Sequence, residues 1–489
     1  MTKKTKHKNP TTVAIIGGGV AGSTIAIRLA MAGVNVHLFE KNASLINSPP
    51  MCHLHAGGNL YREINTDDCK TLMRQCIDIA KLYPDSIDVR PTVFAVPKRD
   101  KGSAQDLLSR LKVLTEYYRE LIKADKTNEV LGQADHYYQV FDKADLEQLS
   151  GCEPKAMPSD TEEWLIPVTQ LVDLDKLQMP IYAVQEYGWN IFRLSASAFL
   201  QLDRLPNAHI HLNTAINELA QNNKTHDWQL TFCNDQGQTQ HLTADFVVNA
   251  CGFRTGIIDD QVGVKVERMV EFKASYLSQW TSKTAYKGQL PEIIFHGERG
   301  TPQGMAQFTP YPDGIFQLHG MTEAITLFKD GLTHSSDNSS QPPMNPQYIS
   351  YIENGWDTPT LVKRTQNAID YVAEFIPNFG NATPIDKALF GGQQVPSADI
   401  STRVADLQVF EHQRYAIAEN VKANSALDVA DGVITALIQA KFLDPSAKKR
   451  PIWHTLDVKD INKLAKKLAK QRRFPVGMAK VNHALILPR

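Results

Sequence analysis

The sequence has no excess of charge of either sign and no long apolar run. Its 489 residues carry 52 Lys and Arg against 53 Asp and Glu, a formal net charge of −1. This balance excludes a global basic field for nucleic acid and an acidic, disordered chain, so we expect no nucleic-acid partner. Because no stretch of about 18 apolar residues occurs, no transmembrane helix is expected. At roughly 150 residues per domain, the length predicts two or three globular domains.

Closely spaced cysteines and several redox motifs are also missing. The six cysteines form no C-x-x-C or other short metal-ligand spacing, so we expect reduced thiols, no metal site and a cytoplasmic protein. The absence of C-x-x-x-x-C, and of a second G-x-G-x-x-G after a strand, argues against a disulfide-reductase-like enzyme with its own nicotinamide domain. The cysteines are Cys52, Cys69, Cys76, Cys152, Cys233 and Cys251.

The strongest positive signal lies in the first forty residues. A β-branched run from Thr12 to Ile16 precedes a glycine-rich turn, a helical stretch to residue 32 and a second apolar run, VNVHLFE, which ends at Glu40. This order predicts a β-α-β unit, and its turn fits G-x-G-x-x-G, the pattern of a dinucleotide-binding fold. A glycine-rich turn without any ligand is the alternative, but it does not explain the acidic residue at the end of the second strand.

Each glycine of the motif has its own physical role. Gly17 permits the tight turn, Gly19 lets the backbone approach a pyrophosphate, and Gly22 allows the helix to pack closely on the strand. The first amides of the helix then face the phosphates. Glu40 follows 18 residues after the last glycine, where it can accept hydrogen bonds from a ribose hydroxyl and disfavours a 2′-phosphate. The cofactor-binding residues expected here are Gly17, Gly19, Val20, Ala21, Gly22, Glu40 and Lys41.

Three later segments show which dinucleotide is expected. Residues 246–252 (FVVNACG), 209–219 (HIHLNTAINEL) and 308–322 (FTPYPDGIFQLHGMT) look like a buried cofactor strand, an adenine-bracketing strand and a substrate-domain hairpin. With the N-terminal unit, they make the chain resemble FAD-dependent oxidoreductases of the D-amino-acid oxidase and glycerol-3-phosphate dehydrogenase superfamily, which includes malate:quinone and 2-hydroxyglutarate dehydrogenases. The resemblance implies FAD as the cofactor, with Ile216, Ala250 and Gly252 on the adenine side.

The resemblance also implies an α/β fold in two interleaved parts. A Rossmann-like FAD-binding domain with a parallel sheet is interrupted by an α+β substrate domain built on an antiparallel sheet, which explains why the cofactor strand at 246–252 comes more than 200 residues after the first. We expect FAD-binding parts at 1–90, 191–265 and 386–445, substrate parts at 91–190 and 266–385, and a basic helical tail at 446–489.

The expected flavin turn near the C-terminus departs from the family. Relatives have a glycine-rich loop that opens a helix under the flavin pyrimidine ring, whereas this chain reads KANSALD at 422–428. If the geometry persists, the helix N-terminus and Lys422 stabilise a reduced, anionic flavin by on the order of 1 kcal/mol. The alternative is a core helix with a Ser or Asn cap. The residues assigned to the flavin ring are Lys422, Asn424, Ser425 and Leu427.

A histidine-containing loop follows the second strand. In relatives this loop runs past the flavin, and His55-Ala56-Gly57 resembles the HAG of 2-hydroxyglutarate dehydrogenases. We expect His55 either to hydrogen-bond the flavin or to take a proton from a substrate hydroxyl or amine as hydride leaves for N5; covalent flavin attachment and a purely structural histidine are the alternatives. His53, Ala56 and Gly57 are assigned to cofactor binding. A second candidate is His319, although strand alternation cannot decide whether it faces the flavin or the sheet core.

Oxidation of a small acid also needs a cation for its carboxylate. A guanidinium suits this task because it makes two parallel hydrogen bonds. The candidates are Arg62, seven residues after His55, Arg254, directly after the cofactor strand, and Arg299, in the glycine-rich turn HGERGTPQG. Each of them can instead be a surface salt-bridge residue.

The C-terminal segment 458–474 (VKDINKLAKKLAKQRRF) has apolar residues at helical spacing and Lys or Arg on the other face. Such a helix can lie on anionic lipid and serve a membrane quinone; packing on its own domain with a solvated Lys face is the alternative. A position on the inner face of a membrane therefore stays open beside the cytoplasmic one, as does the oligomeric state.

The favoured function is an FAD oxidoreductase that transfers a hydride from a small hydroxy- or amino-carboxylate to flavin N5, with quinone or O₂ as acceptor. One alternative is an FAD- and NAD(P)H-dependent monooxygenase or tailoring oxidase on a bulkier substrate, although the Gly-Asp motif of aromatic-ring monooxygenases is missing. Another is a flavin-binding redox sensor or assembly partner without turnover.

Overall fold

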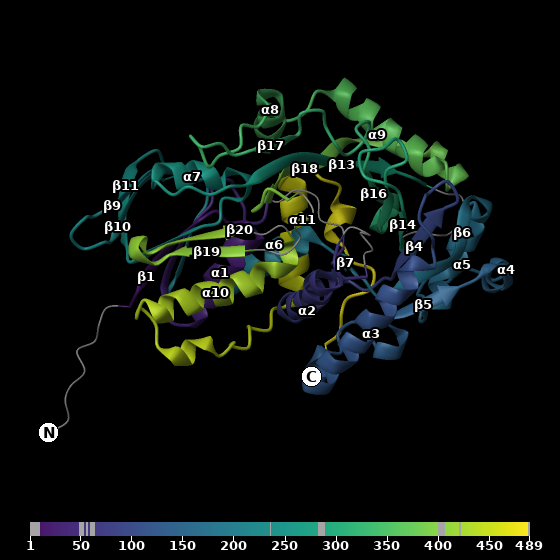
Figure 1. The fold of residues 1–489 in the computed structure, drawn as a ribbon, viewed down its shortest axis with the longest axis horizontal. Coiled ribbons are helices and arrows are strands. Elements are labelled where there is room, and N and C mark those ends of the chain that lie inside the picture. Colours follow the sequence, from purple (N-terminus) through teal and green to yellow (C-terminus); the bar gives the residue numbers. More distant parts are fainter. Residues whose placement is uncertain are drawn as a thin grey trace.

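The fold is built around two large sheets, one parallel and one mainly antiparallel, which occupy opposite ends of the molecule (Figure 1). The computed structural model describes residues 10–47, 53–54, 57–58, 64–234, 236–281, 289–399, 406–419 and 422–487. Among these residues, no helix combines the length and apolar character needed to cross a membrane.

The parallel sheet has the strand order β19-β20-β12-β1-β2-β8. All neighbours are parallel except β19 and β20. The helix α1 (Val20–Met31) connects β1 to β2, and α10 (Ala426–Gln439) packs on α1. The predicted β-α-β unit and parallel sheet are therefore present. The strands are β1 (Thr12–Ile16), β2 (Asn35–Phe39), β8 (Ala208–His211), β12 (Phe246–Asn249), β19 (Asp406–Phe410) and β20 (Tyr415–Glu419).

A three-stranded antiparallel sheet extends this domain. It contains β9 (Ile216–Gln221), β10 (Trp228–Cys233) and β11 (Thr239–Ala244). The segment 209–219, expected as one strand, is instead divided between β8 and β9. The chain turns at Asn213, whose φ is +53°, because the amides of Asn213 and Thr214 bond to the carbonyls of Asn42 and Glu40 just past β2. Asn tolerates this left-handed conformation better than most residues.

The second large sheet has the order β17-β13-β16-β15-β14-β4-β6-β5, with β18 also paired to β13. Its pairs are antiparallel except for β4 and β14. Because the pairing of β18 with β13 continues to Val395, this sheet extends past the expected boundary at 385. The strands are β4 (Thr92–Pro97), β5 (Tyr138–Phe141), β6 (Leu177–Val184), β13 (Met269–Gln279), β14 (Glu292–Phe295), β15 (Ala306–Tyr311), β16 (Ile315–Gly320), β17 (Leu332–His334) and β18 (Thr383–Val395).

Helices cover the outer face of the second sheet and join the two parts. The apolar sides of α5 and α9 share one core with this sheet, and α2 lies between α3 and α10. The short strands β3 (Ile87–Asp88) and β7 (Gly188–Trp189) pair with each other. The remaining helices are α2 (Thr66–Leu82), α3 (Asp106–Ala124), α4 (Lys143–Ser150), α5 (Thr161–Leu171), α6 (Ile191–Asp203), α7 (Thr255–Gln261), α8 (Pro346–Asn354), α9 (Thr358–Ala373) and α11 (Val458–Gln471).

Candidate active site

The three motif glycines occupy different environments in the turn between β1 and α1. Gly17 has φ +106°, and a Cβ there would lie 2.3 Å from the carbonyl oxygen of Ala250 on the neighbouring strand. A Cβ on Gly22 would lie 1.9 Å from the carbonyl oxygen of Gly17, so the helix could not pack as closely. A Cβ on Gly19 would meet no atom within 4 Å. The protein itself therefore gives no steric reason for glycine at position 19, which leaves open space for a ligand to approach the backbone.

Glu40 stands at the carboxyl end of β2 and is only 8% exposed. One carboxylate oxygen accepts a hydrogen bond of 2.9 Å from the amide of Gly18, and the other accepts bonds from the amide and side chain of Asn42. The acidic group is thus held beside the glycine turn, at the edge of a parallel sheet where nucleotides bind in such folds.

The residues expected on the adenine side lie at the same edge. Ala250 contacts Gly17, Gly252 has φ +60°, and Ile216 begins β9. Arg254 forms an ion pair with Glu353 of α8. Burial, followed by the charge of Arg254, lowers the pKa of Lys41, so the structure brings Arg254 close to Lys41 at the nucleotide edge.

The inner face of the second sheet carries a row of buried or partly buried polar side chains. Phe272, Phe308 and Phe316 alternate with these side chains, and they pack on the outer face of the sheet. This alternation places His319 on the inner, polar face, which the sequence alone could not decide. The polar residues of this face on β13, β15 and β16 are Glu271, Lys273, Ser275, Gln307, Thr309, Tyr311, Gln317 and His319.

Hydrogen bonds hold this row together. The side-chain nitrogen Nε2 of Gln317 lies 3.0 Å from the hydroxyl of Ser275 and 3.3 Å from Nε2 of His319. The Tyr311 hydroxyl donates a hydrogen bond to the side-chain oxygen Oε1 of Gln317. Burial lowers the pKa of His319 to about 3, and the nearby charge of Lys422 also contributes. His319 is therefore neutral at physiological pH.

A buried group of charged residues adjoins the polar face. His53, 4% exposed, places Nδ1 2.6 Å from Oε1 of Glu292 at the start of β14. The other oxygen of Glu292 accepts a hydrogen bond of 2.8 Å from Arg90, and Gln307 donates to Oε1 at 2.6 Å. Although burial alone opposes ionisation, the charge of His53 in its protonated form and the charge of Arg90 lower the pKa of Glu292 to about 2. Glu186 lies 3.8 Å from Nε2 of His53.

Sequence reasoning did not identify Arg90, Glu186 or Glu292 as site residues. The sequence did contain a signal for Glu292, because this acidic residue is the first of the otherwise apolar and buried strand EIIF. A carboxylate is rarely buried without a partner. The partners could not be named, because they come from distant segments.

Two further cations contact one carboxylate on the same face. Glu271 of β13 pairs with Lys273, at 2.6 Å, and with Arg299 from the glycine-rich turn. Lys273 also donates a hydrogen bond to Gln393 of β18. The structure therefore brings Arg299 to the polar row that contains His319, whereas Arg254 lies beside Lys41.

The turn at 422–427 opens α10 next to this face. The hydroxyl of Ser425 donates to the carbonyl of Lys422 at 2.6 Å, and Asn424, Ser425 and Leu427 are buried. The charge of Lys422 acts on His319, so the turn and the polar row are neighbours although the glycines of the family loop are missing.

Some of the predicted residues cannot be placed. His55, Ala56, Arg62 and Cys52 lie outside the described residues. Gly57 is described: its φ is +86°, and a Cβ there would lie 2.2 Å from the carbonyl oxygen of Cys69. The described cysteines are free thiols, and no group of three or more His, Cys, Asp or Glu in the described part of the chain could hold a metal ion.

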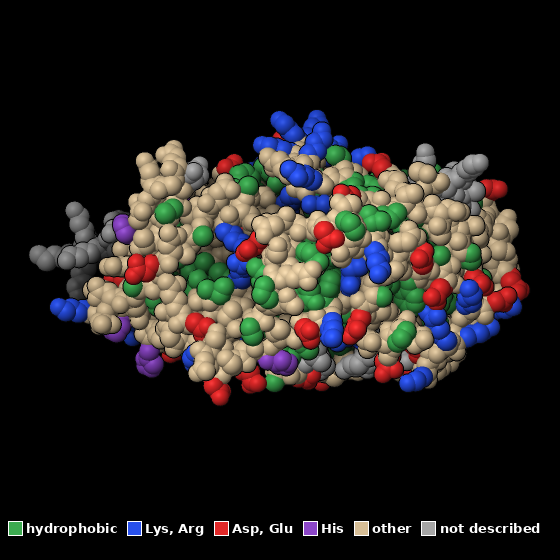
Figure 2. Space-filling model, turned by 90° about the horizontal axis from the view of Figure 1, so that it is seen from above, with side chains coloured by type: hydrophobic (Ala, Val, Ile, Leu, Met, Phe, Trp, Pro, Cys, Tyr) green, Lys and Arg blue, Asp and Glu red, His purple; other side chains and the backbone are tan. Residues whose placement is uncertain are grey.

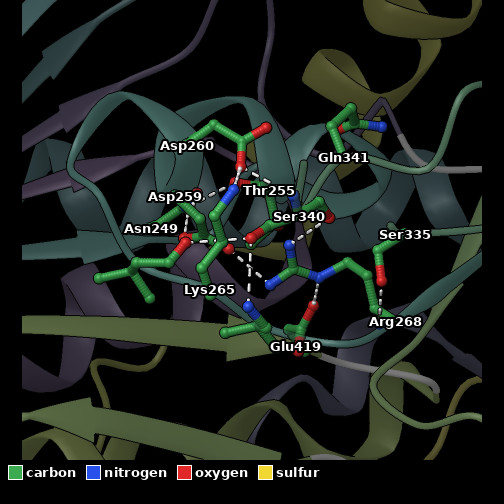
Figure 3. A network of polar contacts seen from close by, with 12 residues as sticks. Asn249, Thr255, Asp259, Asp260, Lys265, Arg268, Ser335, Ser340, Gln341 and Glu419 are labelled. Atoms are coloured by element: carbon green, nitrogen blue, oxygen red, sulfur yellow. Dashed lines mark hydrogen bonds and ion pairs between the residues drawn. The ribbon is translucent and has the colours of Figure 1, made fainter. Parts of the chain in front are cut away.

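A buried arginine joins the two parts of the molecule (Figure 3). Arg268, 1% exposed, donates to Asp259 of α7 at 2.5 Å and to Glu419 at the end of β20 at 2.7 Å. Asn249 of β12 donates to the same Asp259 at 3.0 Å. This network fixes the end of β20 just before the turn at 422–427.

Comparison with known proteins gives a consistent result. A family model described as FAD dependent oxidoreductase (DAO) matches residues 12–392. No match was found among curated protein sequences. Two similar solved structures are L-proline dehydrogenase from P. horikoshii (TM-score 0.54, 13% identity, 91% of this chain and 96% of that one) and L-amino acid deaminase from Proteus vulgaris (0.55, 13%, 92% and 98%). A third is FAD-bound L-α-glycerophosphate oxidase from Mycoplasma pneumoniae (0.56, 12%, 92% and 100%). At these identities the likeness shows a common fold.

Proposed function

We propose a substrate class from one premise: the chain belongs to the DAO family of FAD-dependent oxidoreductases. Its cofactor is FAD, and the glycine turn fits this group, since the space beside Gly19 is open and Glu40 stands next to it. FAD supplies a hydride acceptor at N5 of its ring. The substrate we propose is a small carboxylate whose oxidised carbon carries a hydroxyl or amino group.

The observation that carries this proposal is the buried contact between His53 and Glu292. A hydride can leave such a carbon only if the hydroxyl or amine also loses a proton. Glu292 is ionised and bonded to Nδ1 of His53, so it orients the imidazole and stabilises its protonated form, as a carboxylate does for a catalytic histidine. We therefore assign proton uptake to His53. His55, expected in this role from sequence, remains a candidate outside the described residues.

The carboxylate end of the substrate needs a cationic partner, and Lys273 and Arg299 provide one. Both pair with the single carboxylate of Glu271, so the three groups keep one net positive charge, which supports binding of a second carboxylate at the edge of the polar face. Small amino acids and hydroxy acids have the matching chemistry. The acceptor proposed for the second half of the reaction is quinone or O₂.

The test is anaerobic reduction of the purified holoenzyme by separate pools of hydroxy acids, amino acids and NAD(P)H. Bleaching of the flavin bands by a hydroxy- or amino-acid pool supports the proposal. Bleaching by NAD(P)H alone would identify a monooxygenase instead. If no pool reduces the bound flavin, the protein is a flavin-binding sensor or assembly partner, and the proposal fails.

Variants of the two site residues sharpen this test. His53→Gln should slow reduction by about 100-fold or more, because general-base catalysis contributes on that order. Glu292→Gln should slow it less and alter its pH profile, since the imidazole loses its orienting charge. Unchanged reduction rates in both variants would contradict the assignment.

A further inference from the structure

The helix α11 carries a cationic surface that the proposed reaction does not use. Its buried residues Ile461, Ala465 and Leu468 recur at helical spacing, and the helix packs on α6. The opposite side contains five lysines at positions i, i+4, i+7, i+8 and i+11, so they lie on one face. These lysines, all exposed, are Lys459, Lys463, Lys466, Lys467 and Lys470; we name them the lysine face.

The lysine face is not neutralised by the rest of the described protein. Among the described residues, none of its members forms an ion pair with an acidic side chain. Arg473, also exposed, follows the helix and continues the positive charge. In Figure 2 a dense group of Lys and Arg side chains protrudes from one edge of the molecule, at the same horizontal position as α11 in Figure 1. The overall charge of the chain is only −1, so this is a local concentration.

We propose that the lysine face docks the protein on an anionic lipid surface. The 12 helical residues from Lys459 to Lys470 form a ridge about 20 Å long. A membrane leaflet with anionic lipids is broad and negatively charged, so all lysines of this ridge can contact it at once. Because the apolar side of α11 already packs inside the protein, docking is electrostatic and the helix does not insert. Ile452, six residues before the start of α11 in the sequence, is 95% exposed, and an exposed apolar side chain is accepted better by a lipid boundary than by a nucleic acid.

The lysine face shares no residue with the candidate active site, and it lies outside the segment that matches the family model. The family model ends at residue 392, and α11 begins at Val458. Docking therefore does not depend on the proposed substrate. If the acceptor is a quinone, docking would place the protein at the membrane, in which that acceptor dissolves.

The experiment is cosedimentation of the holoenzyme with phosphatidylcholine vesicles that contain or lack phosphatidylglycerol. We expect binding only to the anionic vesicles and release at high salt, since exposed charges are screened. The triple variant K463Q/K466Q/K470Q should bind about 100-fold more weakly, because each cation near an anionic leaflet contributes roughly fivefold. The control K98Q/K112Q/K123Q removes the same charge from exposed positions on other elements and should bind as the parent does.

Several outcomes would overturn the proposal. These are no binding to anionic vesicles, equal binding by the triple variant, or an equal loss in the control, which would mean that net charge alone decides. Binding to duplex DNA at the same salt without binding to vesicles would identify a different polyanion. Unchanged flavin content and thermal midpoint in both variants exclude misfolding as the cause of any loss.

Discussion

Replacing Gly19 by alanine should separate FAD binding from folding, whereas replacing Gly22 should damage both. The structure gives opposite surroundings for the two added methyl groups. At Gly22 the new carbon would lie 1.9 Å from a backbone oxygen, and at Gly19 it would meet nothing within 4 Å. The two variants carry the same chemical change at different positions, so each is the control for the other.

The magnitudes follow from these contacts. Relief of a backbone overlap requires α1 or the turn to move, which we expect to cost about 3 kcal/mol or more in Gly22→Ala. In Gly19→Ala the gain from restricting the unfolded chain, about 0.4–1 kcal/mol, opposes a similar loss because alanine is a poor N-cap. Its stability should therefore stay within about 1 kcal/mol of the parent. The added methyl group keeps a phosphate of FAD from approaching the backbone. The charge-assisted hydrogen bonds lost in this way are worth about 1.5–3 kcal/mol, which corresponds to a roughly 10- to 150-fold loss of FAD affinity.

Two measurements check this prediction. Urea unfolding of the apoprotein, followed by tryptophan fluorescence, gives the free energy of unfolding, and quenching of FAD fluorescence on titration gives the dissociation constant. The reasoning is refuted if Gly19→Ala destabilises the apoprotein as much as Gly22→Ala does. It is also refuted if Gly19→Ala retains the parental affinity for FAD.

Two further predictions concern the polar side chains of Arg268 and His37. Arg268→Met leaves the buried carboxylates of Asp259 and Glu419 without their shared cation and should lower the free energy of unfolding by about 3 kcal/mol or more in urea; the exposed Arg119→Met should change it little, and equal effects would contradict the role of burial. Burial, followed by the charges of His209 and His211, lowers the pKa of His37 from its ordinary value of 6.5 to about 4. Since the unfolded chain then binds more protons than the folded protein between these values, this contribution to stability is present above pH 6.5 and is lost as the pH falls toward 4. His37→Gln should flatten that part of the curve of unfolding free energy against pH, and an unchanged slope would exclude His37 as its source.

The cofactor half of the molecule was predictable because its signals are local. The turn chemistry of Gly17, Gly19 and Gly22 depends on residues that are close in sequence, and so does the position of Glu40 at the end of β2. The helix α11 was predictable for the same reason, since its apolar spacing extends over its whole length. The sequence predicts one strand where the structure has β8 and β9, because the turn at Asn213 depends on hydrogen bonds to residues past β2.

The half of the molecule that carries the buried charged group was less accessible from sequence. His53, Arg90 and Glu292 are separated by up to 239 positions in the chain, yet they meet in one buried group. No local sequence pattern predicts a contact between residues so far apart in the chain. His319 illustrates the same limit, because alternation in β16 defines two faces but only the neighbouring sheet layers decide which of them is the polar one.

The sequence by itself determined the nucleotide-binding turn, the β-α-β unit around it and the cationic face of α11, since these follow from periodicity, glycine geometry and short-range hydrogen bonding. Only the tertiary structure decided that His53 pairs with Glu292, that Arg299 joins the polar face and that Arg254 lies beside Lys41. The physical reason is that a buried charge must find a partner in space, and the nearest partner is selected by how the sheets pack.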